Sequence, residues 1–508
     1  GYLDNPEKVQ ADRIKAKIDW NINEKNKFSL SYRYNKGLRY NTSSSSSNSI
    51  NFYNNGYTFP NKTNSFSAEL KSTLKNGSNN RLLITSTNEL DDRGTIGKDF
   101  PRVIILDGPG RITFGTENYS TANLLKASNL TLLDAYKFYK NNHTITIGTD
   151  DEFNKLLNVF IPDNYGTYTY NSLDDFINDA KPRSYVRSFS LLDNAAGDQT
   201  KAAAKFNTMR LGFFVSDEIK VNPDFTLTLG LRADQTRLIT TPLADPFFND
   251  TALAKISQYY DLEGARSGQK FTPRWLISPR IGFTYKIPEE QLTIRGGMGI
   301  FAGRIPLVWP GGIYNNNGVS LGGVSVNNLP NGFTFNPDPQ NQPNAQSLGI
   351  DISNARGEMD LVSKKFRVPT VFRTSLAAEK RLGNGWTATA EAIFTKNIWE
   401  IKYTNVNIMP PVGMSKGPDS RNVYSAGSAP VFIPLTYNGK NPYPKFVYLL
   451  SNNHGRRGYS YSLTFSIDKS FRNGFAFNAN YTYGNSVTLN EGTSSQNASQ
   501  WRYIETVN

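Results

Sequence analysis

The 508-residue sequence contains no cysteine and only two histidines, His143 and His454. The absence of cysteine excludes a disulfide scaffold and a thiolate metal site. His143 begins a predicted strand beside a turn and His454 lies in a predicted loop, so we interpret both as surface residues. Three acidic residues stand together at 150–152, but no segment has the spacing of a calcium-binding loop. We therefore predict that the chain is not an enzyme and holds no metal or cofactor.

Long apolar runs are also missing. No stretch approaches the ~20 consecutive apolar residues that a membrane-spanning helix needs, which excludes a helical membrane protein. The mean hydropathy is −0.49, and 56 Lys and Arg against 43 Asp and Glu give a net charge of +13. The basic residues are scattered rather than gathered in blocks, so we expect no nucleic-acid partner. A transmembrane β-barrel passes these tests, because its strands are short and only half apolar.

Instead of long apolar runs, the sequence has stretches in which apolar and polar residues alternate. In FFVSDEIKVNPDFTLTLGLRAD, residues 213–234, apolar side chains occupy every second position on both sides of a Pro-Asp turn. Leu227, Leu229 and Leu231 share one face of an extended strand, and Arg232 lies on the other. This period of two predicts a β-hairpin with one apolar and one polar face.

Seven such hairpins follow one another along the chain, which gives fourteen predicted strands. Most of the strands run about nine to twelve residues, close to the ~9–11 that cross a bilayer when tilted. A tight polar turn joins the two strands of each hairpin. The hairpins cover residues 14–34, 66–87, 132–150, 213–234, 277–303, 373–397 and 459–484.

The connections between hairpins are long and rich in Asn, Ser, Gly, Pro and Tyr. Strict alternation of tight turns and long loops is typical of an outer-membrane barrel, with short turns in the periplasm and long loops outside. We predict an all-β fold, a transmembrane antiparallel β-barrel with long extracellular loops. A soluble β-rich adhesin is the alternative, although it has no reason to place every long loop at one end. The loops span Gly37–Thr63, Asn88–Thr131, Asp151–Asn207, Leu238–Leu276, Arg304–Phe366 and Asn397–Gly458.

The direction of the strands predicts that the chain is part of a larger barrel. With tight turns in the periplasm, the first strand descends from outside and the last strand climbs outward. Both ends would then be extracellular, whereas a complete barrel of even strand number normally has both ends in the periplasm. We therefore expect strands to be missing on both sides.

Each barrel strand has one face toward lipid and one toward the lumen. A charge that faces the middle of a bilayer costs ~2–4 kcal/mol, so we assign the charged face to the lumen. There it would contact a plug or substrate, or simply keep a wet lumen polar. The predicted lumen residues are Arg210, Arg232, Arg280, Lys286, Arg295, Glu379 and Glu391. The predicted lipid-facing residues are Leu211, Phe213, Val215, Leu227, Leu229, Leu231, Ile281, Phe283, Ile294, Ile300, Leu463, Phe465, Ile467, Phe477 and Tyr481.

Ligand recognition is expected in the long loops. The segment that contains Trp309, Tyr314 and Asn315 is aromatic and amide-rich, chemistry that suits sugars and peptides equally well. The segment 171–182 spaces its apolar residues as a short helix does, and we expect it to lie on the outside.

Several stretches resemble a known family. FFVSDEIKVNPDFTLTLGLRAD resembles the hairpin of TonB-dependent outer-membrane receptors, with its aromatic-x-x-x-Asp-Glu run, its Asn-Pro turn and its T-L-x-x-G-L-R-x-D strand. SPRIGFTYKI followed by LTIRGGMGIFAGRIPLVW, and GYSYSLTFSIDKSFRNGFAFNANYTYGNS, resemble the Oar-like sub-family of Bacteroidetes. The resemblance covers most of the chain from about residue 100 to residue 505.

The resemblance implies energy-driven uptake of a bulky nutrient, such as a peptide, glycan or chelate, across the outer membrane. It also implies a barrel of about twenty-two strands, of which about fourteen are here. The implied partners are outer-membrane lipid and lipopolysaccharide, the inner-membrane TonB complex and a surface lipoprotein. The family's plug domain and TonB box have no counterpart in residues 1–508, so we expect one barrel domain. The competing function is a structural or secretion-associated barrel that serves as scaffold or export partner.

Overall fold

The protein is described by a computed structural model that places residues 7–192, 199–351, 355–418, 422–427, 431–435, 446–455, 458–472, 474–490, 494 and 496–504. Fourteen long strands form one antiparallel sheet, in which each pairs with the next of the set along the chain. The seven predicted hairpins are therefore confirmed, although residue 473 in the last turn lies outside the described residues. In sheet order the strands are β1 (Val9–Asn23), β2 (Asn26–Asn41), β4 (Tyr57–Thr73), β5 (Asn79–Asp92), β9 (Asn123–Lys140), β10 (His143–Phe160), β13 (Ala204–Lys220), β14 (Phe225–Leu238), β15 (Leu276–Ile287), β16 (Leu292–Ala302), β19 (Thr370–Gly383), β20 (Trp386–Trp399), β25 (Tyr459–Arg472) and β26 (Phe475–Val487).

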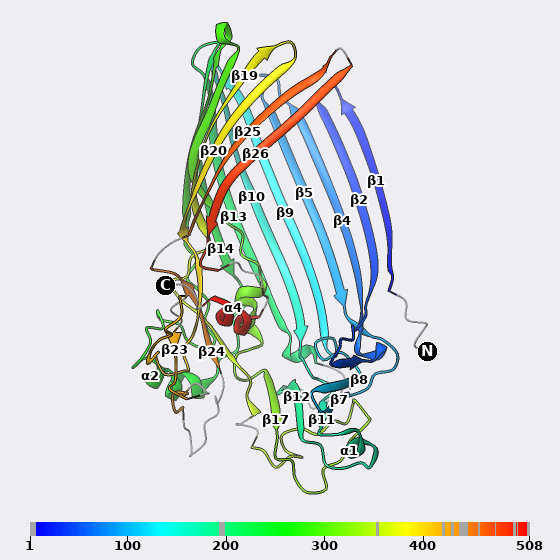
Figure 1. The fold of residues 1–508 in the computed structure, drawn as a ribbon. Coiled ribbons are helices and arrows are strands. Elements are labelled where there is room, and N and C mark those ends of the chain that lie inside the picture. Colours follow the sequence, from blue (N-terminus) through cyan, green and yellow to red (C-terminus); the bar gives the residue numbers. More distant parts are fainter. Residues whose placement is uncertain are drawn as a thin grey trace.

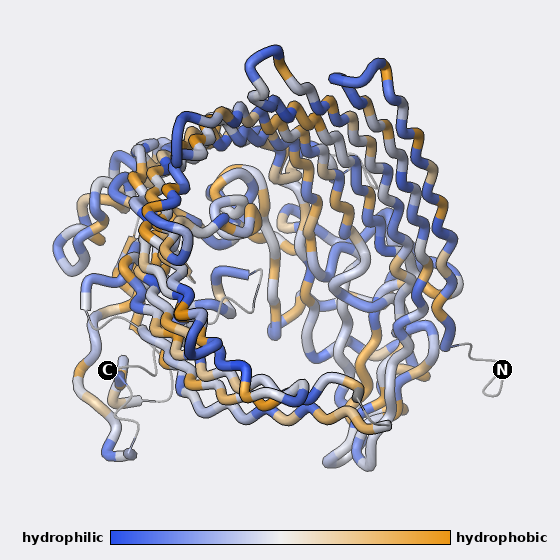
Figure 2. Tube along the Cα trace, turned by 90° about the horizontal axis from the view of Figure 1, so that it is seen from above, coloured by the Kyte–Doolittle hydropathy of each residue, from blue (hydrophilic) through white to orange (hydrophobic). Residues whose placement is uncertain are grey.

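The sheet is tall and curls around a lumen. Figure 1 shows the tilted strands side by side, with the tight turns gathered at one end and the long connections at the other. Seen from above, the strands bend round into a ring-shaped wall, with segments of the connections inside its outline (Figure 2). The outermost strands, β1 and β26, each pair on one side only. We call the two ends of this wall the turn end and the loop end.

The outer face of the wall is apolar and uncovered. Ten of the fifteen residues predicted to face lipid are exposed, among them Phe213 (50%), Leu231 (47%) and Phe465 (57%), and the other five are half-buried. A soluble protein rarely leaves so continuous an apolar surface open to water. The outer face is therefore suited to lipid.

Among the described residues, no helix is long and apolar enough to cross a membrane.

The long connections fold into sheets of their own, which the sequence did not predict. The barrel strands also run further than predicted, up to 18 residues in β9 and β10. The first loop sheet has the order β17 (Leu321–Val326), β12 (Ser184–Ser190), β11 (Thr167–Tyr170), β7 (Arg102–Asp107), β8 (Gly110–Phe114) and β3 (Ser49–Asn51). The second has the order β18 (Met359–Val362), β24 (Val447–Asn452) and β21 (Ile401–Asn405).

Short elements complete the loop end. The helix predicted in segment 171–182 is confirmed as α1 (Leu173–Ile177), where the Ser172 hydroxyl accepts a hydrogen bond from the Asp175 backbone N–H. The other short elements are α2 (Leu253–Ile256), α3 (Val308–Gly311), α4 (Asn497–Ile504), η1 (Tyr53–Asn55), η2 (Thr200–Ala202), η3 (Phe248–Ala252), η4 (Pro288–Glu290), η5 (Gly312–Tyr314), β6 (Gly94–Thr95), β22 (Gly413–Met414) and β23 (Asn422–Val423).

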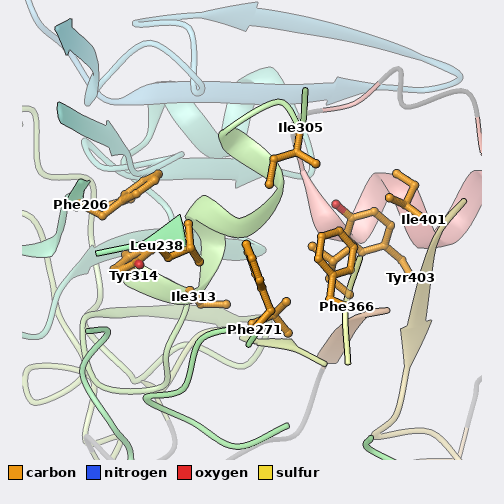
Figure 3. Packing of buried hydrophobic residues seen from close by; sticks show 12 residues of the cluster. Phe206, Leu238, Phe271, Ile305, Ile313, Tyr314, Phe366, Ile401 and Tyr403 are labelled. Carbon is orange, nitrogen blue, oxygen red and sulfur yellow. The ribbon is translucent and has the colours of Figure 1, made fainter. Parts of the chain in front are cut away.

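The hydrophobic core lies at the loop end rather than inside the barrel. One cluster joins the ends of barrel strands to the loops that cover them (Figure 3). In it, Phe206 of β13 and Tyr314 stack with ring centroids 4.4 Å apart, and Phe271 contacts Phe366 at 5.5 Å. Because loops from distant parts of the sequence share this core, we infer that they form a fixed cap.

One carboxyl group is buried within this cap. Asp360 on β18 is 3% exposed, and Asn316 Nδ2 donates to its Oδ2 over 3.1 Å. Its Oδ1 has no hydrogen-bond partner among the described residues. Burial in this apolar setting raises the pKa of Asp360 to about 7, because the charged form loses its hydration.

A substitution tests the assignment of the two strand faces. Leu229→Arg places a charge on the lipid side and should cost ~2–4 kcal/mol of folding free energy in a bilayer. Thr228→Arg, one residue away on the lumen side, should cost well under ~1 kcal/mol. Equilibrium unfolding from lipid vesicles measures both. Equal costs would contradict the assignment.

The buried Asp360 predicts a pH dependence for the cap. Its pKa in the folded protein lies above the unfolded value of ~3.9, so the folded form keeps a proton that the unfolded form loses. The cap should therefore lose stability as pH rises from ~4 to ~7, by up to ~1.4 kcal/mol per pH unit. Hydrogen exchange of β18 and β24, corrected for intrinsic rates, measures this. Asp360→Asn should flatten the trend, and an unchanged trend in that variant would contradict the assignment to Asp360.

Candidate ligand-binding site

The structure places the predicted lumen residues on the side of the wall opposite the apolar face. On β14, Leu229 and Leu231 point outward and are exposed, so the intervening positions and Arg232 point inward. The same alternation holds on β13, β15, β16, β19 and β20, and it covers Arg210, Arg280, Lys286, Arg295, Glu379 and Glu391.

Two of these residues belong to a compact network of ion pairs. Arg232 on β14 reaches Asp150 of β10 at 2.9 Å and Asp234 of its own strand at 2.8 Å. Arg210 on β13 contacts the same two carboxylates at 3.2 and 3.1 Å. The side chains of Arg210 and Asp234 are only 13% and 11% exposed. Each guanidinium therefore bridges two carboxylates in a partly desolvated lumen, where such pairs hold their geometry well.

A glycine makes room for this network. Gly212 on β13 pairs with Asp234 on β14, and a Cβ atom there would sit 2.5 Å from Nη2 of Arg232 and 3.0 Å from Oδ1 of Asp234. Its backbone N–H donates to Asp151 at 3.2 Å. The residue is therefore needed for close approach.

The acidic run at 150–152 supplies carboxylates that form ion pairs with arginines. Besides Asp150, Glu152 lies 3.7 Å from Arg210 and 3.2 Å from Arg304 of the β16–β19 connection. Within the described part of the chain, no group of His, Cys, Asp or Glu is arranged to hold a metal ion. Asp150, Glu152, Asp234 and Arg304 were not predicted as site residues. The signal for Asp234 was present, since it follows Arg232 by two positions on the same strand face.

The network forms one wall of a cavity at the loop end, which we call the loop-end cavity. It has a volume of about 220 Å³ and is lined on another side by the segments that lead into β15 and β19. The only carboxylates among its lining residues are Asp150 and Asp234, and Phe271, Trp275 and Phe366 supply aromatic surface. Six arginines are among its lining residues, Arg210, Arg232, Arg274, Arg280, Arg304 and Arg367.

The other predicted lumen residues lie away from this cavity. Arg295 pairs with Glu379 at 3.4 Å in the half of the wall nearer the turn end. Lys286 lies next to the turn of its hairpin and is exposed, and Glu391 is half-buried opposite Ala377. The lumen therefore has one concentrated site and several dispersed charges.

The predicted loop contacts have a different position from the one expected. Tyr314 is 6% exposed and donates its hydroxyl to the carbonyl of Thr240 at 2.8 Å. Asn315 is 7% exposed, and Trp309 packs against the same core as Tyr314. A ligand would not reach Tyr314 or Asn315 in this conformation. We correct the expectation for Tyr314 and Asn315 and assign them to the packing of the cap, while a ligand contact of the half-buried Trp309 stays a prediction.

An apolar outer face, a charged lumen and a folded cap at one end define the class as a membrane β-barrel wall. The sequence matches the outer membrane beta barrel domain family over residues 1–507. The chain therefore belongs to the outer membrane β-barrel domain family, and its location is the outer membrane. No curated protein matches the chain in sequence.

Solved structures share the fold. The outer membrane transporter YddB from Escherichia coli is 12% identical, with 94% of this chain and 48% of that chain covered and a TM-score of 0.53. The ferric enterobactin receptor PfeA from Pseudomonas aeruginosa, in complex with BCV-L6, is 10% identical, with 95% of this chain and 53% of that chain covered and a TM-score of 0.50. The siderophore receptor PirA from Pseudomonas aeruginosa is 11% identical, with 94% of this chain and 57% of that chain covered and a TM-score of 0.48. The chain spans about half the length of these structures.

The ion-pair network predicts that two lumen arginines differ sharply in their effect on stability. Arg232→Gln leaves Asp150 and Asp234 short of a partner and should cost about 2–4 kcal/mol. Arg280→Gln breaks no ion pair among the described residues and loses only a cation–π contact with Phe301, so it should cost no more than ~1 kcal/mol. Denaturant unfolding of the purified protein in detergent compares the two. A similar loss for both would contradict the network.

Proposed function

We propose that the chain is the barrel wall and outer cap of a TonB-dependent receptor that takes up a bulky nutrient across the outer membrane. The observation that carries this proposal is the loop-end cavity, which is lined both by charged residues of the barrel strands and by segments of the folded cap. A scaffold needs the apolar outer face but has no need for either feature. The sequence resemblance to the Oar-like sub-family supports the same interpretation. YddB is described as a transporter and PfeA as a ferric enterobactin receptor, which agrees with it.

The proposal gives the wall a direction in the membrane. The turn end faces the periplasm and the cap faces outward, in contact with lipopolysaccharide and with a surface lipoprotein that covers it. Strands β1 and β26 carry unpaired backbone groups on one edge, which lipid cannot satisfy. Further strands therefore pair with these edges and complete the barrel.

The proposed mechanism has three steps. The cap and the loop-end cavity bind a peptide, glycan or chelate from outside. Energy from the inner membrane then reaches a plug domain through the TonB complex, and the plug rearranges. The ligand passes through the lumen, whose charged wall stays hydrated.

Uptake by living cells tests the proposal. A strain that expresses the full-length protein should deplete at least one bulky compound from a complex medium, and a gene deletion should abolish that depletion. A protonophore should stop depletion but leave binding to the cell surface intact, because only translocation needs energy. Mass spectrometry of the medium measures both effects.

Two controls sharpen this test. The deletion strain with an empty vector reports loss through other routes. The expressing strain at low temperature reports binding alone. Identical depletion with and without the gene, or depletion that a protonophore does not affect, would overturn the function and favour a structural or export role.

A further inference from the structure

We propose that the loop-end cavity binds the oxyanion end of a ligand, a carboxylate or phosphate group, through guanidinium groups that the protein leaves without a carboxylate partner. The inference rests on the proposed function, since it names the chemical class of what that receptor captures.

The charge balance of the cavity is the first argument. Asp150, Glu152 and Asp234 are the carboxylates in the network, and their ion pairs are made with Arg210, Arg232 and Arg304. Arg274, Arg280 and Arg367 line the same cavity. None of these three has a carboxylate within ion-pair distance in the described ranges of the chain. Three like charges gathered in one cavity repel one another, and a bound anion would relieve that repulsion.

Two of these three guanidinium groups are held in fixed positions without being neutralised. The guanidinium of Arg280 lies over the ring of Phe301, 4.6 Å from its centroid, and that of Arg367 lies over Trp399 at 4.9 Å. Cation–π contacts of this kind orient a guanidinium and leave its N–H donors free for an acceptor.

The backbone of Arg367 is clamped as well. Its N–H donates to Oδ1 of Asn452 at 2.7 Å, and its carbonyl accepts from Nδ2 of the same amide at 2.9 Å. Asn452 on β24 is 3% exposed. One buried side chain of the cap therefore fixes the segment that presents this guanidinium to the cavity. Such preorganisation reduces the ordering cost of binding.

The size of the cavity limits what enters it. A volume of about 220 Å³ gives room for one phosphate or a small carboxylic acid. A bulky nutrient would therefore insert an anionic end and leave its body in the cap. Guanidinium forks match the planar or tetrahedral oxygens of such groups, and aromatic surface from Phe271, Trp275 and Phe366 borders them.

Isothermal titration of the purified full-length receptor in detergent tests the inference, with inorganic phosphate and citrate as anionic probes and maltose as the neutral one. Phosphate or citrate should bind and maltose should not bind at this site. Arg280→Gln and Arg367→Gln should each weaken anion binding about ten-fold. The matched control is Arg295→Gln, the same change on the same lumen face but outside the cavity, and it should leave binding unchanged.

Stability separates binding from structural damage. Because Arg280 and Arg367 have no carboxylate partner in the described chain and each loses only a ring contact, their glutamine variants should shift the denaturant midpoint far less than Arg232→Gln does. Absence of anion binding to the full-length protein would overturn the inference, and would indicate that a carboxylate of the protein itself fills the cavity. Equal weakening by Arg295→Gln would overturn it too. If the protein takes up a nutrient but binds no anion, only this inference is rejected. If it binds anions but takes up no nutrient, the proposed transport function is rejected and the anion site remains.

Discussion

Lipid on one side of each strand and water on the other is the constraint on which this structure depends. Because successive side chains of a strand point to opposite faces, every apolar residue that lipid demands is followed by one that faces the lumen. Leu229, Leu231 and Phe213 occupy the first set of positions, and Arg210 and Arg232 the second. The lumen cannot be packed with apolar side chains as a soluble core is, and carboxylates hold Arg210 and Arg232 in place there. The hydrophobic core then forms where the strands leave the bilayer, under the cap.

The same constraint decides how much of the fold could be predicted from the sequence. Hairpins and faces depend on residues close in sequence, and the period of two and the tight polar turns located all seven. The cap depends on distant pairs. Val103 on β7 pairs with Tyr168 of β11, and Tyr185 of β12 pairs with Val326 of β17. Nothing in the local pattern of a loop rich in Asn, Ser and Gly specifies such partners, so the loop sheets were missed.

For the candidate site, too, the features set by local sequence were predictable and the contacts between distant residues were not. Arg210, Arg232 and Arg280 were predicted to face the lumen because alternation alone requires it. Their assembly into one cavity was not predictable, since Asp150 lies 82 positions from Arg232 in the sequence and meets it only through the pairing of β10, β13 and β14. For Tyr314 the prediction itself was wrong, because the residue is buried. An aromatic residue in a polar loop was expected to contact a ligand, but Phe206 at the end of a barrel strand offers a stacking partner and draws it into the core.

The cap and the network also explain why the cavity stays open. Three carboxylates satisfy the arginines that would otherwise destabilise the wall, and they lie on β10 and β14, close to the strands that carry those arginines. Arg280 and Arg367 are instead held by aromatic rings, and Asn452 fixes the chain beside one of them. A ring contact orients a cation while its donors remain available. The wall is therefore neutralised where it must be stable, and it stays positively charged where the lumen meets the cap.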